Sequence, residues 1–186
     1  MRIVAGAAKG RTLRAPKGSK TRPMMDRAKE AIFSALAAKV EDAAVLDLYA
    51  GTGSLGLEAL SRGARSAVFV EWRCEAVRVL LVNIAAVGLG GRAVSAKVED
   101  FLGGEAGTFD LAFVDPPYEV PLPSVEAVLG RLVRWLADEA TVVVHRRSGS
   151  GEISGIPGLA LSDRRRYGDA EITRFTKARL NKEAEA

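Results

Sequence analysis

The residues best suited to chemistry form a short loop, Asp115-Pro116-Pro117-Tyr118, which follows an apolar run at residues 109–114. The run predicts a buried strand, and open parallel sheets bind ligands at the carboxyl ends of their strands. The Asp115 carboxylate and the Pro116 carbonyl can accept both N–H groups of an exocyclic amine, and the Tyr118 ring can stack on the base. The two prolines stiffen the loop. These four residues are the predicted catalytic group, for methyl transfer onto a base nitrogen.

A second loop, at residues 47–53, suits a nucleoside-type cofactor. Gly51-x-Gly53-x-x-Gly56 matches the dinucleotide fingerprint, in which glycine lets the backbone approach the ligand. An acid such as Glu71, after the next strand, accepts bonds from ribose hydroxyls. Asp47 would repel a pyrophosphate but suits the amino and sulfonium groups of S-adenosylmethionine. The predicted cofactor residues are Asp47, Tyr49, Gly51, Thr52, Gly53, Glu71, Trp72, Asp100 and Phe101.

Each of these features also has a structural explanation. The glycine pattern fits oxidoreductases as well as methyltransferases, and Asp47 and Glu71 could be ordinary acids at strand ends. Asp100 is placed to accept a bond from an adenine amine, but it could equally be an acid at a helix N-terminus beside Glu99. A Pro-Pro turn after a strand is common, although it does not explain both the acid before it and the aromatic residue after it.

The composition indicates one domain with a small extension. The chain has 186 residues, 48% of them hydrophobic, and no segment approaches the roughly 18 apolar residues that span a bilayer. No secretory signal is evident at the N-terminus, so we expect a cytoplasmic protein without membrane contact, and a monomer. A single cysteine, Cys74, excludes an internal disulfide, and with a single histidine, His145, we expect no metal site.

The charge distribution indicates a polyanion partner. Residues 1–29 hold nine Lys or Arg residues and one acid, although the whole chain has a formal net charge of only +4. A basic arm on a mildly acidic body is typical of nucleic-acid binders, although such runs also occur as solvated tails. Interleaved apolar residues favour an ordered arm. The predicted RNA-binding residues are Arg2, Lys9, Arg11, Arg22 and Arg27.

The order of elements predicts an α/β protein. Strands are expected at residues 44–49, 67–71, 93–96, 109–114, 141–145, 160–166 and 171–177, and helices at 26–39, 54–61, 73–87, 98–102 and 124–136. This alternation gives a doubly wound, Rossmann-like sheet of seven mostly parallel strands with an antiparallel C-terminal strand, because residues 167–169 are too few for a parallel crossover. We expect an N-terminal hairpin at 1–15 within a basic extension, 1–39, then the main domain, 40–179, and a frayed tail, 180–186.

Two reactive side chains are expected to be inert. Cys74 has no His or Lys partner near it in the sequence, so a covalent mechanism lacks its nucleophile. His145 ends an apolar strand, which favours a structural role. Arg146 and Arg147 follow it and could extend a phosphate-binding face.

With these residues in view, the chain resembles the D-type family of bacterial ribosomal RNA methyltransferases, which modify guanine N2 in the 16S RNA of the small ribosomal subunit. The resemblance covers nearly the whole length, and the most specific part of it is Arg22-Pro23-x-x-Asp26-Arg27 beside the glycine loop. The motifs that carry it are Arg2-Ile3-Val4-Ala5-Gly6 with Gly10-Arg11, the segment 22–33, the segment 46–64, Phe113 to Tyr118, and Tyr167-Gly168-Asp169.

The resemblance implies a class I methyltransferase fold, S-adenosylmethionine as donor, and a guanine of 16S ribosomal RNA as acceptor, within a partly assembled small subunit. It also implies that Asp115 to Tyr118 hold the base and that Arg22 to Arg27 line the substrate side. The chain departs from the family at Met24-Met25, where small polar residues are usual, and at His145-Arg146, where an acid often follows the fifth strand. No role is carried over to either pair.

Other activities fit parts of the pattern. An amino-methyltransferase acting on DNA adenine or on a protein glutamine would share both loops, although the basic arm disfavours glutamine. A nicotinamide oxidoreductase would share the glycine loop but lacks an apparent base at a hydride site. A non-catalytic RNA-binding protein would keep the arm without needing the Asp115 loop.

Overall fold

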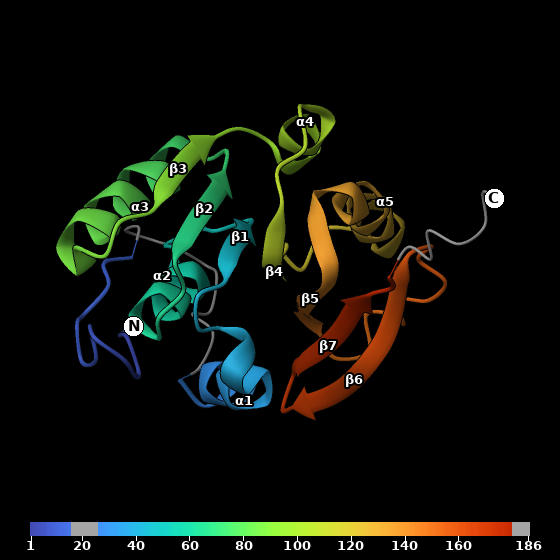
Figure 1. Ribbon diagram of the computed structural model, residues 1–186, viewed down its shortest axis with the longest axis horizontal. Helices are drawn as coiled ribbons and strands as arrows, with labels where there is room; N and C mark the ends of the chain where they lie inside the picture. The colour runs from blue at the N-terminus through green and yellow to red at the C-terminus, as the bar shows by residue number, and fades with distance from the viewer. Residues whose placement is uncertain (16–25, 180–186) are drawn as a thin grey trace.

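The computed structural model describes residues 1–15 and 26–179, which form a seven-stranded sheet with helices on both faces (Figure 1). The order is β3-β2-β1-β4-β5-β7-β6, and every pair is parallel except those that involve β7. The predicted doubly wound sheet with an antiparallel C-terminal strand is confirmed. The strands are β1 (Ala44–Leu48), β2 (Ser66–Glu71), β3 (Arg92–Ser95), β4 (Phe109–Val114), β5 (Leu136–Arg147), β6 (Leu159–Tyr167) and β7 (Ala170–Lys177).

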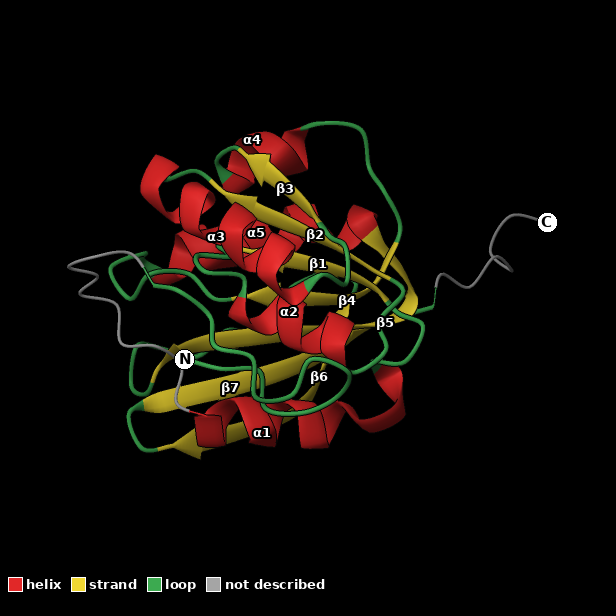
Figure 2. Ribbon diagram, turned by 90° about the vertical axis from the view of Figure 1, so that its left-hand side faces the viewer, coloured by secondary structure: helices red, strands yellow, loops and turns green. Residues whose placement is uncertain are grey.

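The helices divide into two layers. Residues of α1, α2 and α3 form one buried cluster with one face of the sheet, and residues of α4 and α5 form a second cluster with the other face. In Figure 2, α1 runs beside β6 and β7. The helices are α1 (Asp26–Leu36), α2 (Ser54–Ser61), α3 (Cys74–Val87), α4 (Val98–Gly103) and α5 (Leu122–Leu132), with the 3-10 turns η1 (Ala37–Lys39) and η2 (Val133–Trp135).

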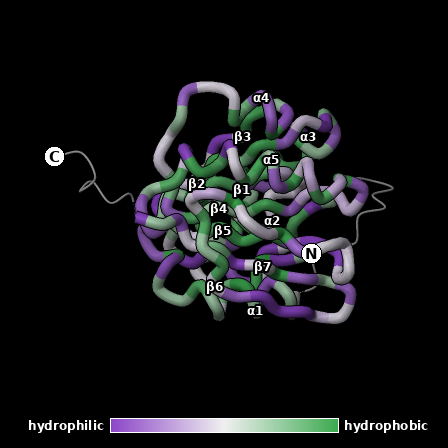
Figure 3. The backbone as a smooth tube through the Cα atoms, turned by 90° about the vertical axis from the view of Figure 1, so that its right-hand side faces the viewer, coloured by the Kyte–Doolittle hydropathy of each residue, from purple (hydrophilic) through white to green (hydrophobic). Residues whose placement is uncertain are grey.

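Alternation along the central strands decides which face each side chain meets. In β4, Phe113 belongs to the cluster under α1, α2 and α3, whereas Val114 belongs to the other cluster. All five residues of β1 are buried, as expected for a parallel strand that is covered on both faces. Figure 3 shows this hydrophobic centre as the green stretch through β1, β4 and β5. By alternation, Asp47 in β1 faces the α2 side.

The predicted N-terminal hairpin is only partly correct. Arg2 and Thr12 form an isolated antiparallel bridge rather than a two-stranded ladder. The backbone N–H groups that follow bond to α2 instead: Val4 donates to the Glu58 carboxylate and Ala8 donates to Ser61 Oγ. Since Ile3 is fully buried in the core, residues 1–15 pack as an arm on the body.

Several predicted boundaries were wrong. Helix 73–87 begins one residue later, at Cys74, and helix 124–136 spans 122–132 before continuing as a 3-10 turn. Strand 141–145 extends over 136–147. On its N-terminal side, an irregularity at Glu139, with φ 61°, shifts the register against β4 and pairing resumes at Leu136; on its C-terminal side, Arg146 and Arg147 pair with β7. None of the helices in residues 1–15 and 26–179 is long and apolar enough to cross a membrane.

Candidate active site

The glycine loop between β1 and α2 requires left-handed backbone at three positions. Tyr49, Gly51 and Gly53 have φ of 58°, 55° and 79°. At Gly53 a Cβ atom would lie 2.5 Å from Leu80 Cδ1, so a side chain at this position would also force Leu80 to move. The loop therefore brings backbone to the carboxyl edge of β1 without side chains in the way.

Asp47 lies beneath this loop and is 1% exposed. Its Oδ2 accepts a hydrogen bond from the Gly56 backbone N–H at 2.9 Å. Burial raises the pKa of Asp47 well above its usual value, against the lowering effect of the Gly56 bond, and the nearby Asp115 and Glu71 carboxylates raise it further. Asp47, Glu71 and Asp115 thus lie close enough for their charges to interact, and a cationic ligand beside them would relieve their repulsion.

Glu71, at the end of β2, connects the glycine loop to the neighbouring strand. Its Oε2 accepts from Gly51 N–H at 3.0 Å, and its Oε1 accepts from the N–H groups of Trp72 and Arg73 at 3.0 and 2.9 Å. The side chain is 4% exposed. Glu71 is therefore bonded to the glycine loop, its binding of ribose hydroxyls stays a prediction, and Trp72 beside it is 54% exposed.

The remaining predicted cofactor residues, Tyr49, Asp100 and Phe101, differ in what their side chains contact. The Tyr49 hydroxyl donates to Glu99 Oε1 at 3.4 Å, which brings the first turn of α4 to the loop. Burial, followed by the charge and hydrogen bond of Glu99, raises the pKa of Tyr49. Asp100, next to Glu99, is exposed, whereas the Phe101 ring stacks on Trp135 in the core at 4.6 Å. The partly buried Phe101 ring thus packs against the hydrophobic cluster under α4 and α5, and its contact with a cofactor stays a prediction.

Asp115 and Tyr118 stand at the carboxyl end of β4, beside the glycine loop. The Asp115 N–H reaches Leu48 O of β1 at 3.4 Å, and the Asp115 side chain is 34% exposed. Pro116 is buried, and the Pro117 carbonyl closes the turn by accepting from Val120 N–H at 2.9 Å. Tyr118 is 46% exposed, so one acid and one ring are presented together at the sheet edge.

His145, for which the sequence predicted only a structural role, contacts this loop directly. Its Nδ1 lies 2.7 Å from Asp115 Oδ1, and its ring meets the Tyr118 ring edge-on with centroids 5.9 Å apart. Burial lowers the pKa of His145, but the hydrogen bond and charge of Asp115, together with the charge of Asp169, outweigh it and leave the pKa raised. The signal that could have found this contact is the alignment of two adjacent parallel strands that end together.

The arm reaches the cofactor loop through Asn83 of α3, a second residue that the sequence did not reveal. Asn83 is 1% exposed. Its side chain accepts from Arg14 N–H at 2.9 Å and donates to Arg14 O at 3.1 Å, and also to Thr52 O at 2.9 Å. The Thr52 hydroxyl in turn lies 3.7 Å from Met1 Sδ. Met1 of the arm therefore contacts the glycine loop directly, whereas Arg14 reaches it through Asn83.

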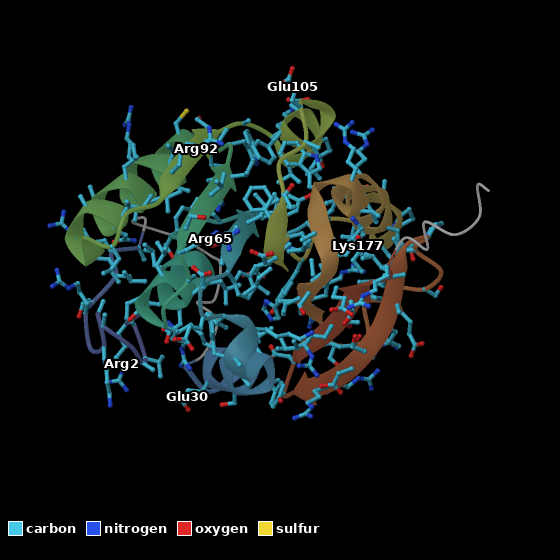
Figure 4. All side chains as sticks on the ribbon, in the orientation of Figure 1. Arg2, Glu30, Arg65, Arg92, Glu105 and Lys177 are labelled. Carbon is cyan, nitrogen blue, oxygen red and sulfur yellow. The ribbon has the colours of Figure 1, made fainter. Side chains whose placement is uncertain are left out.

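The predicted RNA-binding residues lie on or beside this arm. Arg2 and Lys9 are exposed, and the guanidinium of Arg11 donates to Ala86 O of α3. Figure 4 shows Arg2 pointing outward at the lower edge of the molecule. Arg22 lies outside the described residues, and of Arg27 only its backbone position in α1 is described. No cluster of three or more possible metal ligands occurs in residues 1–15 and 26–179.

A doubly wound sheet in the order 3-2-1-4-5-7-6, with an acidic glycine loop beside an Asp-Pro-Pro-Tyr loop, defines a Rossmann-like methyltransferase. The family described as conserved hypothetical protein 95 matches residues 1–176. The chain is 37% identical over 152 residues to ribosomal RNA small subunit methyltransferase D of Escherichia coli K12, which covers 81% of this chain and 77% of the relative. The same-named protein of Haemophilus influenzae is 32% identical, over 77% of each chain.

A solved structure supports the same assignment. The methyltransferase-fold protein yhhF of Escherichia coli superposes with a TM-score of 0.86 at 33% identity, over 96% of this chain and 98% of that one. The chain therefore belongs to the ribosomal RNA small subunit methyltransferase D family, and the family and fold that the sequence predicted are confirmed.

Proposed function

We propose that this protein methylates the exocyclic N2 amine of a guanine in 16S ribosomal RNA. Family membership establishes the coarser part of that statement: the chain is an S-adenosylmethionine-dependent ribosomal RNA methyltransferase. The single observation that supports the finer part is the pair of partly exposed Asp115 and exposed Tyr118 at the carboxyl end of β4, directly beside the glycine loop.

The residues around the glycine loop fit S-adenosylmethionine. Asp47, Glu71 and Asp115 form an acidic group that suits a ligand with ammonium and sulfonium groups. Ser54 Oγ, at the start of α2, is buried without a hydrogen-bond partner among the residues that the structure describes, and a ligand carboxylate would satisfy it. Glu71 would bind the ribose, and Trp72 would contact the nucleoside. When bound, the cofactor supplies an electrophilic methyl group on a positively charged sulfur.

The chain's own task is to orient an amine that is a poor nucleophile. The lone pair of a base amine is delocalised into the ring, so the amine reacts only when its hydrogens are held away from the direction of attack. Asp115 Oδ2 and Pro116 O would accept the two N–H groups, and the rigid prolines keep those acceptors aligned. Alignment of this kind accounts for most of the expected acceleration. Transfer of the methyl group leaves a cationic, strongly acidic ammonium on the base, and Asp115 or water can take its proton.

Tyr118 and the arm would hold the RNA around the flipped base. The exposed Tyr118 ring offers a stacking surface worth about 1–3 kcal/mol per base. Arg2, Lys9, Arg11, Arg22 and Arg27 would contact phosphates, which bind mainly through charge and fix the register of the RNA. A partly assembled small ribosomal subunit as substrate, a monomeric enzyme and a cytoplasmic location are parts of the same proposal.

A substitution at Asp115 should affect methyl transfer far more than binding of the cofactor. Asp115→Ala should abolish methyl transfer while S-adenosylmethionine affinity, measured by calorimetry, stays within about tenfold of wild type. Asp138→Ala, an exposed acid on β5, is a matched control and should keep full activity. Undiminished methylation by the Asp115 variant would show that this loop is not part of the mechanism. If the product were N6-methyladenine rather than N2-methylguanine, the proposed acceptor would be wrong.

A further inference from the structure

We propose that His145 is a positioning residue that holds the Asp115 carboxylate in its working orientation; this inference rests on the proposed function of Asp115. The register of β4 and β5 pairs Val114 with Val144, so the next residue of each strand, Asp115 and His145, stand side by side. The 2.7 Å contact between His145 Nδ1 and Asp115 Oδ1 is therefore imposed by the sheet itself.

The imidazole is well fixed. The His145 side chain is 8% exposed, and its backbone pairs with Ile172 of β7 in the antiparallel part of the sheet. The Tyr118 ring meets it edge-on from the Asp115 loop. A buried ring on a central strand cannot easily turn away, so it is a rigid anchor for the partly exposed carboxylate of Asp115.

The two oxygens of Asp115 consequently have different roles. Oδ1 is bonded to His145, whereas Oδ2 has no hydrogen bond to any residue that the structure describes. A carboxylate held at one oxygen keeps the other pointing in one direction, which is what an acceptor for a substrate N–H requires. Without this anchor, the side chain could rotate and both oxygens would be hydrated.

The charges around His145 support the pairing. Asp115, directly after β4, and Asp169 of the β6–β7 turn both favour its protonated form, and the Asp115 carboxylate also raises the pKa of Asp47 in β1. Ile172, the β7 residue that pairs with it, is apolar. A charge-assisted bond is shorter and stronger than a neutral one, so the pair restrains Asp115 firmly.

Three substitutions test this role. His145→Leu removes the donor at similar volume, His145→Asn keeps an N–H donor near the position of Nδ1, and His145→Gln places its amide further out, near the position of Nε2. We expect the Leu variant to lose about 100-fold in kcat, the effect of a misplaced catalytic group, with KM for RNA and cofactor affinity within about threefold. The Asn variant should recover to within about fivefold of wild type, and the Gln variant should recover less.

The assay follows transfer of a tritiated methyl group from S-adenosylmethionine to small ribosomal subunits that lack the modification, with thermal unfolding of each variant as the folding control. If the Leu variant unfolds at the assay temperature, the comparison of the Asn and Gln variants tests the inference instead. Both carry a polar amide and differ in where they place it. Equal activity of Asn and Gln, or a Leu variant within twofold of wild type in kcat, would overturn the inference.

The same assay separates this inference from the proposed function. The methylated nucleoside of the wild-type reaction is identified by mass spectrometry. A product other than N2-methylguanosine would overturn the proposed acceptor, while the ratio between the His145 variants would still decide whether this side chain positions Asp115.

Discussion

Glu58 is the residue on which docking of the N-terminal arm most depends, and its replacement gives a measurable prediction. This carboxylate is fully buried in α2 and accepts from the N–H groups of Val4 and Ala5 at 2.8 and 3.0 Å. It also lies 3.2 Å from Lys29 Nζ, which is fully buried too, and 2.8 Å from Arg62 Nε. One side chain thus joins the arm, α1 and α2.

The loss of folding stability expected for Glu58→Gln follows from the burial of this carboxylate. The substitution keeps the volume but leaves the Lys29 ammonium buried without its counter-charge, and removing one partner of a buried ion pair costs about 3–5 kcal/mol. For a domain of this size, that lowers the melting temperature by roughly 6–20 °C. The double variant Lys29→Met/Glu58→Gln should recover part of the loss, because it removes the unpaired charge as well.

The coupling free energy between Lys29 and Glu58 is measured by urea unfolding. The four proteins are the wild type, Lys29→Met, Glu58→Gln and the double variant. Glu30→Gln, an exposed acid on α1 that Figure 4 labels near the arm, is the matched control and should unfold like the wild type. In Glu58→Gln, hydrogen exchange at Val4 and Ala5 should accelerate. Equal urea midpoints for Glu58→Gln and the wild type would refute this account of the arm.

Three further predictions concern the active site. Gly53→Ala forces φ 79° on a side chain 2.5 Å from Leu80 Cδ1, so it should cost about 1–3 kcal/mol in urea unfolding and weaken cofactor binding, more than Gly10→Ala, which has φ 82° in open space. Burial raises the pKa of Asp47, so its contribution to folding stability is complete below the ordinary Asp range and is lost as pH rises through the folded-state pKa. Asp47→Asn should therefore raise the melting temperature of the ligand-free protein more at about pH 8 than at about pH 4. A gain that does not depend on pH would contradict this. Tyr118→Ala should lower kcat/KM by about 5- to 150-fold in steady-state kinetics, whereas Tyr118→Phe should stay near wild type.

Local patterns predicted the parts of the fold that depend on local chemistry. The apolar runs at 44–49 and 109–114 become β1 and β4 because a strand buried on both faces needs apolar residues on both sides. Gly51 and Gly53 were predicted to shape a loop, and both adopt positive φ. The hairpin at the C-terminus followed from the short connection at 167–169, and β6 and β7 are antiparallel.

Contacts between distant residues could not be predicted in the same way. Glu58 reads in the sequence as one acid in an apolar helix, and only the folded arm supplies its partners, Val4 and Ala5, more than 50 residues away. Asn83 joins Arg14 to Thr52 by the same kind of long-range bond.

The contact between His145 and Asp115 had a partial signal. Both residues follow strands that were predicted from the sequence, and adjacent parallel strands end at one edge. The contact requires β4 and β5 to be neighbours and to pair Val114 with Val144, in a register that shifts near Glu139. Those two facts belong to the assembled sheet rather than to either strand.

The most direct test of the central claim is a nucleoside map of 16S ribosomal RNA from cells that lack this protein. Our account predicts that one N2-methylguanosine disappears, that it returns with the wild-type chain, and that it does not return with Asp115→Ala. A map identical to that of the parent cells, or restoration by the Asp115 variant, would contradict the account.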